Sequence, residues 1–314
     1  MHAFFSPHSA QTQSIQSVFL LVLLIAAVIF LIVAAGVCYS IVRFRSRRPV
    51  SGDAASAPEP RQIFGSPKLE ILWTVVPIAI VTGLFVVTVR GMVFIDAPQD
   101  SPRSPDIVIT GHQWWWEARY PNGVLTTWDI HIPASHRLRA RIESGDVIHD
   151  FWAPELARKM DAIPGRWGYI WLEADSPGIY AGTCSEFCGA EHAWMRFRVI
   201  AQSQLDFDAW MVQQAAPSPA PTGLAAEGAP LFQTKKCADC HTVAATAPSS
   251  EKGPSLAHLA RHETLGGGIA LNTPANVTLW LTDPQAAKPG NRMPSTPLTP
   301  DETRALLAYL ESLT

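Results

Sequence analysis

One group of cysteine, histidine and methionine side chains could bind metal ions. The chain contains Cys184-x3-Cys188-x3-His192-x2-Met195, and His149 lies 35 residues upstream of the first cysteine. Thiol, imidazole and thioether are soft or intermediate ligands, a mixture that suits copper in electron transfer better than hard cations. A tetrahedral zinc site is one alternative, but it would give Met195 no purpose. A Cys184–Cys188 disulfide is another, but it would leave both histidines and Met195 unexplained.

A second group, Cys237-Ala-Asp-Cys240-His241, has the C-x-x-C-H pattern of covalent haem attachment. In such a motif the two thiols add to the haem vinyl groups, and the histidine becomes an axial ligand of the iron. A redox C-x-x-C or half of a zinc site would not require histidine in the next position. The chain has no second C-x-x-C with which to complete a zinc site.

A haem of this kind needs a second axial ligand, and Met293 is the only methionine downstream of the motif. It precedes a tail, Thr299–Leu310, that has a cap, an acidic first turn and apolar residues at helical spacing. We therefore expect Met293 to be the sixth ligand. His258 and His262 are alternatives, although as helical residues they would lie on the surface.

The elements that must position these groups begin with two apolar runs. Val18 to Val42 is uncharged over 25 residues, and Ile71 to Val89 over 19. At about 1.5 Å per residue the first exceeds the roughly 30 Å core of a bilayer and the second nearly matches it. We expect transmembrane helices at about residues 17–42 and 70–92. A signal peptide is the alternative for the first run, but residues 1–16 lack the basic residue that it needs.

Charge is distributed unevenly along the chain. The net charge is +4 for residues 1–95, −6 for residues 96–212 and −1 for residues 226–314, which sum to −3. Basic residues gather between the two apolar runs, namely Arg43, Arg45, Arg47, Arg48, Arg61 and Lys68. The positive-inside rule makes this loop cytoplasmic, so the N-terminus and everything after residue 95 are expected on the outer face. A charged fraction of 16% also argues against a nucleic-acid partner.

The middle part consists of short runs rich in β-branched and aromatic residues, separated by turn residues. These runs are residues 107–110, 123–132, 138–142, 167–173 and 194–200. Their number and spacing predict a β-sandwich or barrel. Residues 213–225, rich in Pro, Ala and Ser and without charge, are typical of a semi-extended linker.

These motifs resemble subunit II of the haem-copper cytochrome c oxidases over residues 10–212. The shared motifs are the copper-ligand string with Asp146-Val-x-His149, Gly111-His-Gln-Trp-Trp-Trp116, Asp161-Ala-Ile-Pro-Gly165 and Leu69-Glu70-x2-Trp73-Thr-x2-Pro77. Residues 226–314, including Gly253-Pro-Ser-Leu256, resemble a small class I cytochrome c. A subunit II joined to a cytochrome resembles the caa-type oxidases.

The resemblance implies a multidomain fold in four parts. Residues 1–95 would form a two-helix transmembrane hairpin and residues 96–212 a cupredoxin-like β-sandwich or barrel that holds two coppers. Residues 213–225 would be the linker, and residues 226–314 a small all-α cytochrome c domain.

The resemblance also implies the roles of individual residues. The binuclear copper ligands would be two bridging thiolates, two imidazoles, a weak thioether and a backbone carbonyl, supplied by Cys184 and Cys188, His149 and His192, Met195, and Glu186. The side chain of Glu186 would also help to hold magnesium at the junction with subunit I. The haem ligands would be Cys237, Cys240, His241 and Met293.

Two further residues match family positions outside the ligand sets. Trp114 would be the residue through which electrons reach the copper site, whereas Trp115 and Trp116 are expected to pack in the core or at the membrane interface. Glu70 would stand at the entrance of a proton-uptake path. Cys38, inside the first apolar run, is interpreted as a small buried hydrophobe without a role.

The implied function is that of the electron-input subunit of a bacterial aerobic terminal oxidase in the cytoplasmic membrane. Electrons would come from cytochrome c or a membrane-bound donor, and dioxygen would be reduced, with proton pumping, on partner subunit I, with subunit III also present. Alternatives are a copper-containing nitric oxide reductase subunit and, in another class, a membrane-anchored copper-delivery protein. A quinol oxidase subunit is disfavoured because the copper ligands are intact.

Overall fold

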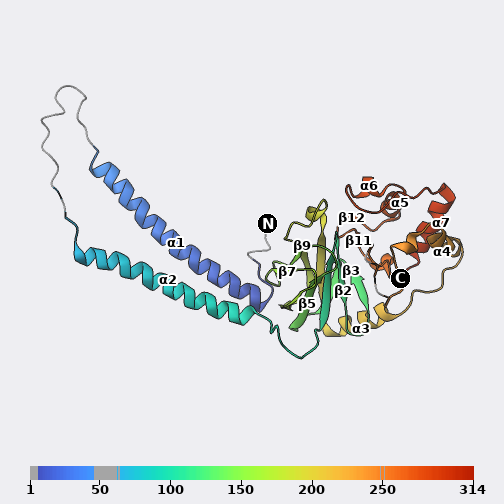
Figure 1. Ribbon diagram of the computed structural model, residues 1–314, viewed down its shortest axis with the longest axis horizontal. Helices are drawn as coiled ribbons and strands as arrows, with labels where there is room; N and C mark the ends of the chain where they lie inside the picture. Colours follow the sequence, from blue (N-terminus) through green and yellow to red (C-terminus); the bar gives the residue numbers. More distant parts are fainter. Residues whose placement is uncertain (1–5, 46–61, 63, 248, 251) are drawn as a thin grey trace, which may run out of the picture. The chain divides into compact units, whose positions relative to one another are not determined.

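The computed structural model describes residues 6–45, 62, 64–247, 249–250 and 252–314 (Figure 1). The chain divides into two compact units, one made of Ser14–Phe94 and the other of Met1–Gln13 with Ile95–Thr314. Three arginines of the predicted cytoplasmic loop, Arg47, Arg48 and Arg61, lie outside the described residues.

Two long apolar helices, α1 (Ala10–Arg43) and α2 (Pro67–Ile95), confirm the predicted pair (blue and cyan in Figure 1). Both are long and apolar enough to cross a membrane. They extend beyond the spans proposed from the uncharged runs alone, by polar residues at both ends of α1 and at the start of α2, and by Val93–Ile95 at the end of α2. Pro77 lies inside α2, as membrane helices tolerate.

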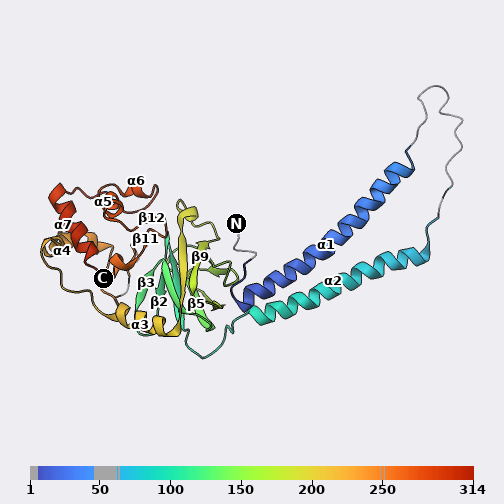
Figure 2. The same cartoon turned by 180° about the vertical axis from the view of Figure 1, so that it is seen from behind.

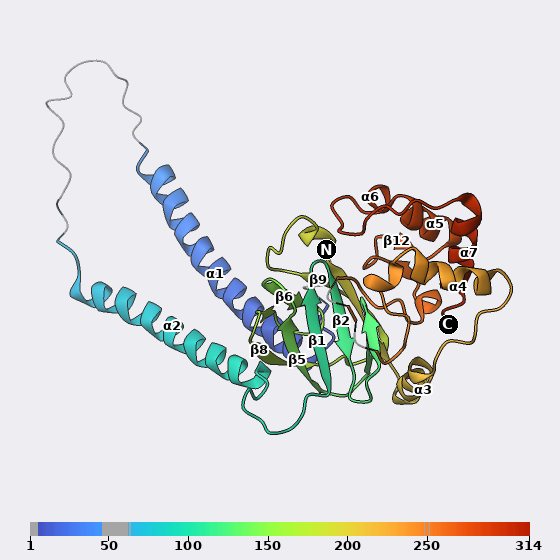
Figure 3. The ribbon, with the colours of Figure 1, turned by 45° about the vertical axis from the view of Figure 1, so that its right-hand side comes forward.

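The second unit contains a sandwich of two five-stranded sheets, which confirms the predicted β architecture. One sheet has the order β3-β2-β1-β5-β8 and the other β4-β10-β9-β6-β7; Figure 3 shows β8, β5, β1 and β2 of the first side by side. The strands are β1 (Ile107–His112), β2 (Trp115–Arg119), β3 (Leu125–Thr127), β4 (Asp129–Pro133), β5 (Leu138–Ser144), β6 (His149–Trp152), β7 (Met160–Ala162), β8 (Trp167–Leu172), β9 (Gly178–Cys184) and β10 (Arg196–Gln202).

Alternating side chains close the core between the two sheets. Along β1 and β10 every second residue is buried, the pattern of strands with one face inward. Trp116 from the first sheet meets Phe151 and Phe197 from the second, with ring centroids 5.5 and 5.7 Å apart and edges toward faces. Such aromatic contacts join the sheets and make the scaffold rigid near the strands that carry His149 and Cys184.

The observed strands differ from those predicted in three respects. Residues 123–132 form two strands, because Trp128 adopts a left-handed conformation (φ 62°) that turns the chain between β3 and β4. The last predicted strand begins at Arg196, since His192–Trp194 form a 3-10 helix. Four observed strands, β2, β6, β7 and β9, were not among those predicted.

The C-terminal part is helical, as the resemblance implied, with one short two-stranded sheet made of β11 (Thr264–Leu265) and β12 (Ala270–Leu271). Its α-helices are α4 (Leu224–Thr234), α5 (Pro274–Thr282), α6 (Pro284–Ala287) and α7 (Pro300–Glu311), and α3 (Gln204–Ala215) precedes it. Two 3-10 helices, Cys237–Asp239 and Leu259–Arg261, complete it. The predicted cap of the last helix is confirmed: Thr299 and Glu302 form a capping box, with each side chain accepting from the other's backbone N–H.

Helices α4 and α7 cross at very close range (Figures 1 and 2). Gly228 makes this possible, because a Cβ atom at that position would stand 2.0 Å from the carbonyl oxygen of Ala305. Phe232 on α4 then packs edge-on against Tyr309 on α7, with ring centroids 5.7 Å apart. The absence of a side chain at residue 228 therefore determines how the two helices of this part meet.

His258 and His262 are not the surface residues expected from a helical interpretation. His258 is buried in a left-handed conformation ahead of the second 3-10 helix, and its Nε2 lies 3.1 Å from the carbonyl oxygen of Gln214 in α3. His262 Nδ1 lies 2.9 Å from Asp129 Oδ2 in β4. Both histidines therefore contact the β-sandwich or the helix that follows it.

Asp129 is the centre of this polar contact. Its carboxylate accepts two hydrogen bonds from Arg198, at 2.8 and 2.9 Å, in addition to the contact with His262. Burial alone would raise the pKa of Asp129, but the hydrogen bonds from His262 and Arg198 outweigh it and hold the pKa well below its usual range. Arg198 also pairs with Glu263 at 2.7 Å, so one arginine connects the sandwich with the helical part.

The close crossing of α4 and α7 predicts the effect of a single methyl group. Gly228→Ala should destabilise the helical part by roughly 3 kcal/mol, since the new Cβ meets backbone that cannot move aside. Denaturant unfolding of the full chain, followed by circular dichroism, measures this. Ala226→Ser, at an exposed position of the same helix, is the matched control and should change the midpoint little. An unchanged midpoint for Gly228→Ala would contradict the close contact.

Candidate metal and haem centres

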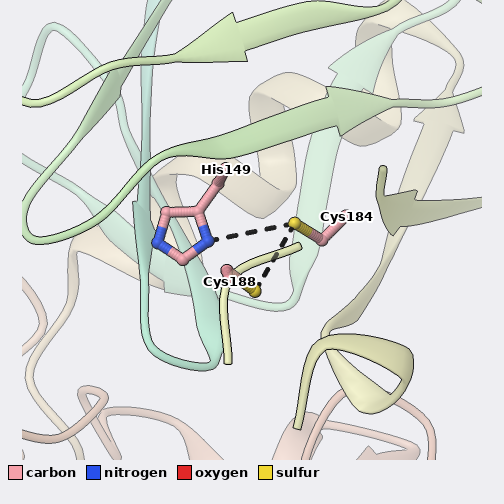
Figure 4. A group of neighbouring side chains, drawn as sticks. All are labelled: His149, Cys184 and Cys188. Carbon is pink, nitrogen blue, oxygen red and sulfur yellow. Dashed lines mark hydrogen bonds between the residues drawn. The ribbon is translucent and has the colours of Figure 1, made fainter. Parts of the chain in front are cut away.

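The sandwich brings together the two thiols of the first motif. Cys184 ends β9, Cys188 follows in the next loop, both are buried, and their Sγ atoms lie 3.8 Å apart (Figure 4). The Nδ1 atom of His149, at the start of β6, lies 3.9 Å from Cys184 Sγ. These three residues form a group able to hold a metal ion. Both cysteines are free thiols, so the structure contains no disulfide between them.

The other predicted copper ligands complete the cluster from the opposite side. His192 Nδ1 lies 3.6 Å and Met195 Sδ 3.7 Å from Cys188 Sγ. The carbonyl oxygen of Glu186 lies 3.2 Å from Cys184 Sγ, whereas the Glu186 side chain is exposed. Each sulfur thus has one imidazole nearby, with the carbonyl oxygen beside Cys184 and the thioether beside Cys188. This donor set fits a soft, two-metal site better than a single tetrahedral zinc.

The surroundings of the two thiols favour loss of the proton of Cys184. The contact with Cys188, together with the imidazole of His149, lowers the pKa of Cys184 to about 3 despite its burial. The same contact raises the pKa of Cys188, because a second negative charge beside the first is unfavourable. Metal cations in the site would stabilise the negative charge of both thiolates.

Asp146 orients one of the imidazoles. Its Oδ1 atom lies 2.8 Å from His149 Nε2, which leaves Nδ1 directed toward Cys184. The backbone N–H groups of Gln113 and Val147 donate to the same carboxylate, at 2.7 and 2.6 Å. A carboxylate behind a ligating histidine fixes its tautomer and ring orientation.

Trp114 is hydrogen-bonded to the backbone of Cys188, in the loop that follows β9. It is buried, and its Nε1–H donates to the carbonyl oxygen of Cys188 at 3.1 Å. The Gln113 side chain donates to the same oxygen at 2.6 Å. Gly189 makes room for both side chains: its φ is +118°, and a Cβ atom there would lie 3.1 Å from each of them. Trp116 is a core residue, as expected.

The C-x-x-C-H motif forms a separate group in the helical part. Cys237 begins a 3-10 helix that follows α4, and both thiols of the motif are half-buried. His241 Nδ1 lies 2.8 Å from the carbonyl oxygen of Pro254, so Nε2 is the nitrogen left to bind a metal. Burial lowers the pKa of His241, which favours the neutral imidazole that binds iron. Gly253 permits the contact, since a Cβ atom there would lie 2.9 Å from His241 Cε1.

The remaining predicted residues lie outside these clusters. Met293 is half-buried in the segment between α6 and α7. Glu70 lies in the first turn of α2, where it lines a surface hollow with Pro67 and Thr74. Cys38, expected to be a buried hydrophobe, is an exposed residue of α1.

Several residues of these sites were not identified from the sequence as functional candidates. Asp146 and Gln113 were visible only as members of longer motifs. Glu191 was not identified at all, although it directly precedes His192 and is almost completely buried. Lys288 and Arg292, in the segment before Met293, also gave no local signal. Their contacts join residues more than ninety positions apart in the sequence, which no local pattern can indicate.

Comparisons with known proteins agree with this organisation. Family models match the transmembrane domain of cytochrome c oxidase subunit II at residues 2–90, its periplasmic domain at residues 124–203 and cytochrome c at residues 225–314. Cytochrome c oxidase subunit 2 of Alkalihalophilus pseudofirmus is 35% identical over 98% of this chain and 89% of its own length.

Two further proteins are similar to parts of this chain. Cytochrome c oxidase subunit 2 of a Bacillus species, strain PS3, is 35% identical over 81% of this chain and 76% of its own length. The solved periplasmic domain of cytochrome oxidase subunit II from Bradyrhizobium japonicum is 28% identical, covers 38% of this chain and 96% of its own, and has a TM-score of 0.34. The matched periplasmic and cytochrome c domains imply a copper centre and a haem c. The matched transmembrane domain and the two long apolar helices imply a membrane protein with two spans. The chain belongs to the cytochrome c oxidase subunit 2 family, in a form in which a cytochrome c domain follows the periplasmic domain.

Proposed function

We propose that this chain is the electron-input subunit of an aerobic terminal oxidase. The observation that carries the proposal is the convergence of two thiols, two imidazoles and a thioether in one cluster, in a chain that also contains a C-x-x-C-H motif. When bound, a c-type haem accepts and releases single electrons, and a thiolate-bridged copper pair passes them on to the haem of a partner subunit, where dioxygen is reduced. The residues of this chain supply binding, orientation and insulation from water.

The proposed copper ligands would have different roles in the cluster. Cys184 and Cys188 would bridge two metal ions, and His149 and His192 would each complete one. Met195, fully buried, would be the weak ligand, and Glu186 would contribute its backbone carbonyl. The exposed carboxylate of Glu186 is proposed to help hold magnesium at the junction with subunit I.

The β-sandwich supports the electron-transfer role of this site. The ligands come from β6, β9 and the loop between β9 and β10, and the first two are strands of one sheet. Since Trp116 and Phe197 pack between the sheets, the ligand-bearing strands have little freedom to move. Little movement on reduction means little reorganisation energy, which favours rapid transfer.

The proposed haem ligands are Cys237, Cys240, His241 and Met293. Hydrogen bonding of His241 Nδ1 to Pro254 presents Nε2 to the iron and increases the basicity of the ring. The thioether of Met293 would favour reduced iron and raise the potential, which suits a donor to copper.

The proposal extends to topology and partners. The four parts with boundaries at residues 95, 212 and 225 remain our proposed domain division, with both redox parts on the periplasmic face of a bacterial cytoplasmic membrane. Partners would be subunits I and III, together with cytochrome c or a membrane-bound donor. Glu70 would stand at the entrance of proton uptake, and Trp114 would conduct electrons toward the copper site. The two curated relatives are cytochrome c oxidase subunits, so the nitric oxide reductase and copper-delivery alternatives are not favoured.

The first test is metal content and substrate of the purified complex. We expect two coppers and one covalent haem per chain, and oxygen consumption that depends on reduction of that haem. Metal analysis and oxygen-electrode assays measure both, with nitric oxide consumption assayed in parallel. Haem without copper, or nitric oxide consumption without oxygen consumption, would contradict the proposal.

The second test concerns Asp146. Asp146→Asn removes the negative charge behind His149 and should lower copper affinity by about 10- to 100-fold, because the imidazole loses its orientation and basicity. Competition with a copper chelator measures the affinity. Asp208→Asn is the matched control, since Asp208 is exposed on α3, where it accepts a hydrogen bond from Gln204. Equal copper affinity in both variants would show that Asp146 has no such role.

The third test identifies the sixth iron ligand. Met293→Ala should change the visible spectrum and lower the haem potential by a substantial fraction of the roughly 0.8 V range that axial ligands span. Optical redox titration measures this shift. Met211→Ala, a methionine in α3, should leave the haem spectrum unaltered. If Met293→Ala also leaves it unaltered, the ligand is another residue.

A further inference from the structure

The segment between α6 and Met293 contacts the loop between β9 and β10, residues 185–195, which is called the copper loop below. Lys288 Nζ lies 2.8 Å from Glu191 Oε2, and Glu191 is the residue before His192. A Cβ atom on Gly290 would be 3.7 Å from both Ala190 and Glu191, and Gly290 has a φ of +93°. The chain of the cytochrome part therefore approaches the copper loop closely, at a position where only glycine is unstrained.

The Lys288–Glu191 ion pair is almost completely buried. The two side chains are 5% and 2% exposed, and the second carboxylate oxygen, Glu191 Oε1, has no hydrogen-bond partner among the described residues. Burial lowers the pKa of Lys288 and raises the pKa of Glu191, and each partner opposes the shift of the other. Removing one partner would leave a buried charge without compensation, so the pair selects the arrangement in which the two side chains meet.

The same segment also contacts the aromatic residue beside the copper loop. The guanidinium carbon of Arg292 lies 5.1 Å from the ring centroid of Trp114, within the range of a cation–π contact. Arg292 also donates to the Oε1 atom of Gln113. Trp114 and Gln113 both donate to the carbonyl oxygen of Cys188. Each of these two side chains therefore links Arg292 to the backbone of a proposed copper ligand.

We propose that residues 288–293 form the docking element across which electrons pass from the haem of this chain to its copper pair, with Lys288 and Glu191 as the positioning pair. The proposal rests on the function proposed above and adds the surface that this function uses. The docking element connects the residue next to Met293 with Trp114, and the buried ion pair holds the two in register.

Docking of this kind explains how two parts of like net charge can meet. The parts carry −1 and −6, so long-range attraction does not bring them together. A buried pair acts over a short distance and is screened by salt much less than exposed charges are. Covalent attachment supplies the high effective concentration, and the ion pair selects the orientation.

The test measures internal electron transfer in the intact oxidase complex. An electron is delivered to the haem by a light-activated donor, and its arrival at copper is followed optically. Lys288→Met should slow this step by at least about tenfold, because misplacement by about 1 Å is costly in a positioned reaction. Glu191→Gln should slow it similarly. The double variant should be no slower than either single one, because the two side chains act as a unit.

Lys235→Met is the matched control. Lys235 forms an ion pair of the same 2.8 Å length with Glu302 inside the cytochrome part, so the same substitution leaves the docking element intact. Its transfer rate should equal that of the unaltered chain. Haem and copper spectra are recorded for every variant, since a loss of either group would mimic slow transfer.

The outcomes separate the docking element from the proposed function. If Lys288→Met transfers electrons as fast as the unaltered chain, the docking element is overturned and the proposed function is not. If the unaltered chain transfers no electrons from haem to copper, the proposed function is overturned. If Lys288→Met fails to assemble, Arg292→Gln replaces it, because that side chain is exposed. An unchanged rate in Arg292→Gln with an intact haem spectrum would likewise overturn the docking element.

Discussion

Two thiols held 3.8 Å apart inside a β-sandwich are the constraint on which the rest of this structure depends. Two thiolates at that distance repel each other, and burial removes the water that would screen them. Cationic metal ions resolve this conflict, but only if the ligands are already in place. The aromatic core between the sheets provides that placement, because Trp116 contacts both His149 and Phe151. The negative charge of the site therefore calls for metal ions, and the rigid fold places the ligands that bind them.

Residue type and local spacing were sufficient to predict much of this arrangement. The copper ligands could be predicted because five of them lie within twelve residues and copper chemistry requires their types. The capping box at Thr299 was predictable for the same reason, since it depends on neighbours in sequence. The two apolar helices follow from composition alone. Each of these features is determined within one element or one loop.

Features that depend on contacts across the fold could not be predicted. Strands β6 and β9 carry His149 and Cys184, yet neither was predicted, because they contain short polar or glycine-interrupted sequences whose pairing comes from neighbouring strands. His262 was expected on the surface because nothing near it in sequence indicates Asp129, which lies 133 residues away. The break at Trp128 depends on tertiary packing too, since a tryptophan has no intrinsic preference for a left-handed conformation.

The contacts of the cytochrome part with the sandwich are of two kinds, and the difference bears on their roles. Asp129, Arg198 and His262 form a network whose charges are mutually satisfied, which suits a permanent attachment. Glu191 and Lys288 form a single pair with one oxygen left without a partner among the described residues. Glu191 directly precedes the proposed copper ligand His192, and Lys288 lies in the segment that leads to Met293. Replacement of that pair by apolar side chains of similar volume could stabilise the contact. Retention of a buried charge pair at this position is therefore better explained by the orientation that it imposes than by the stability that it adds.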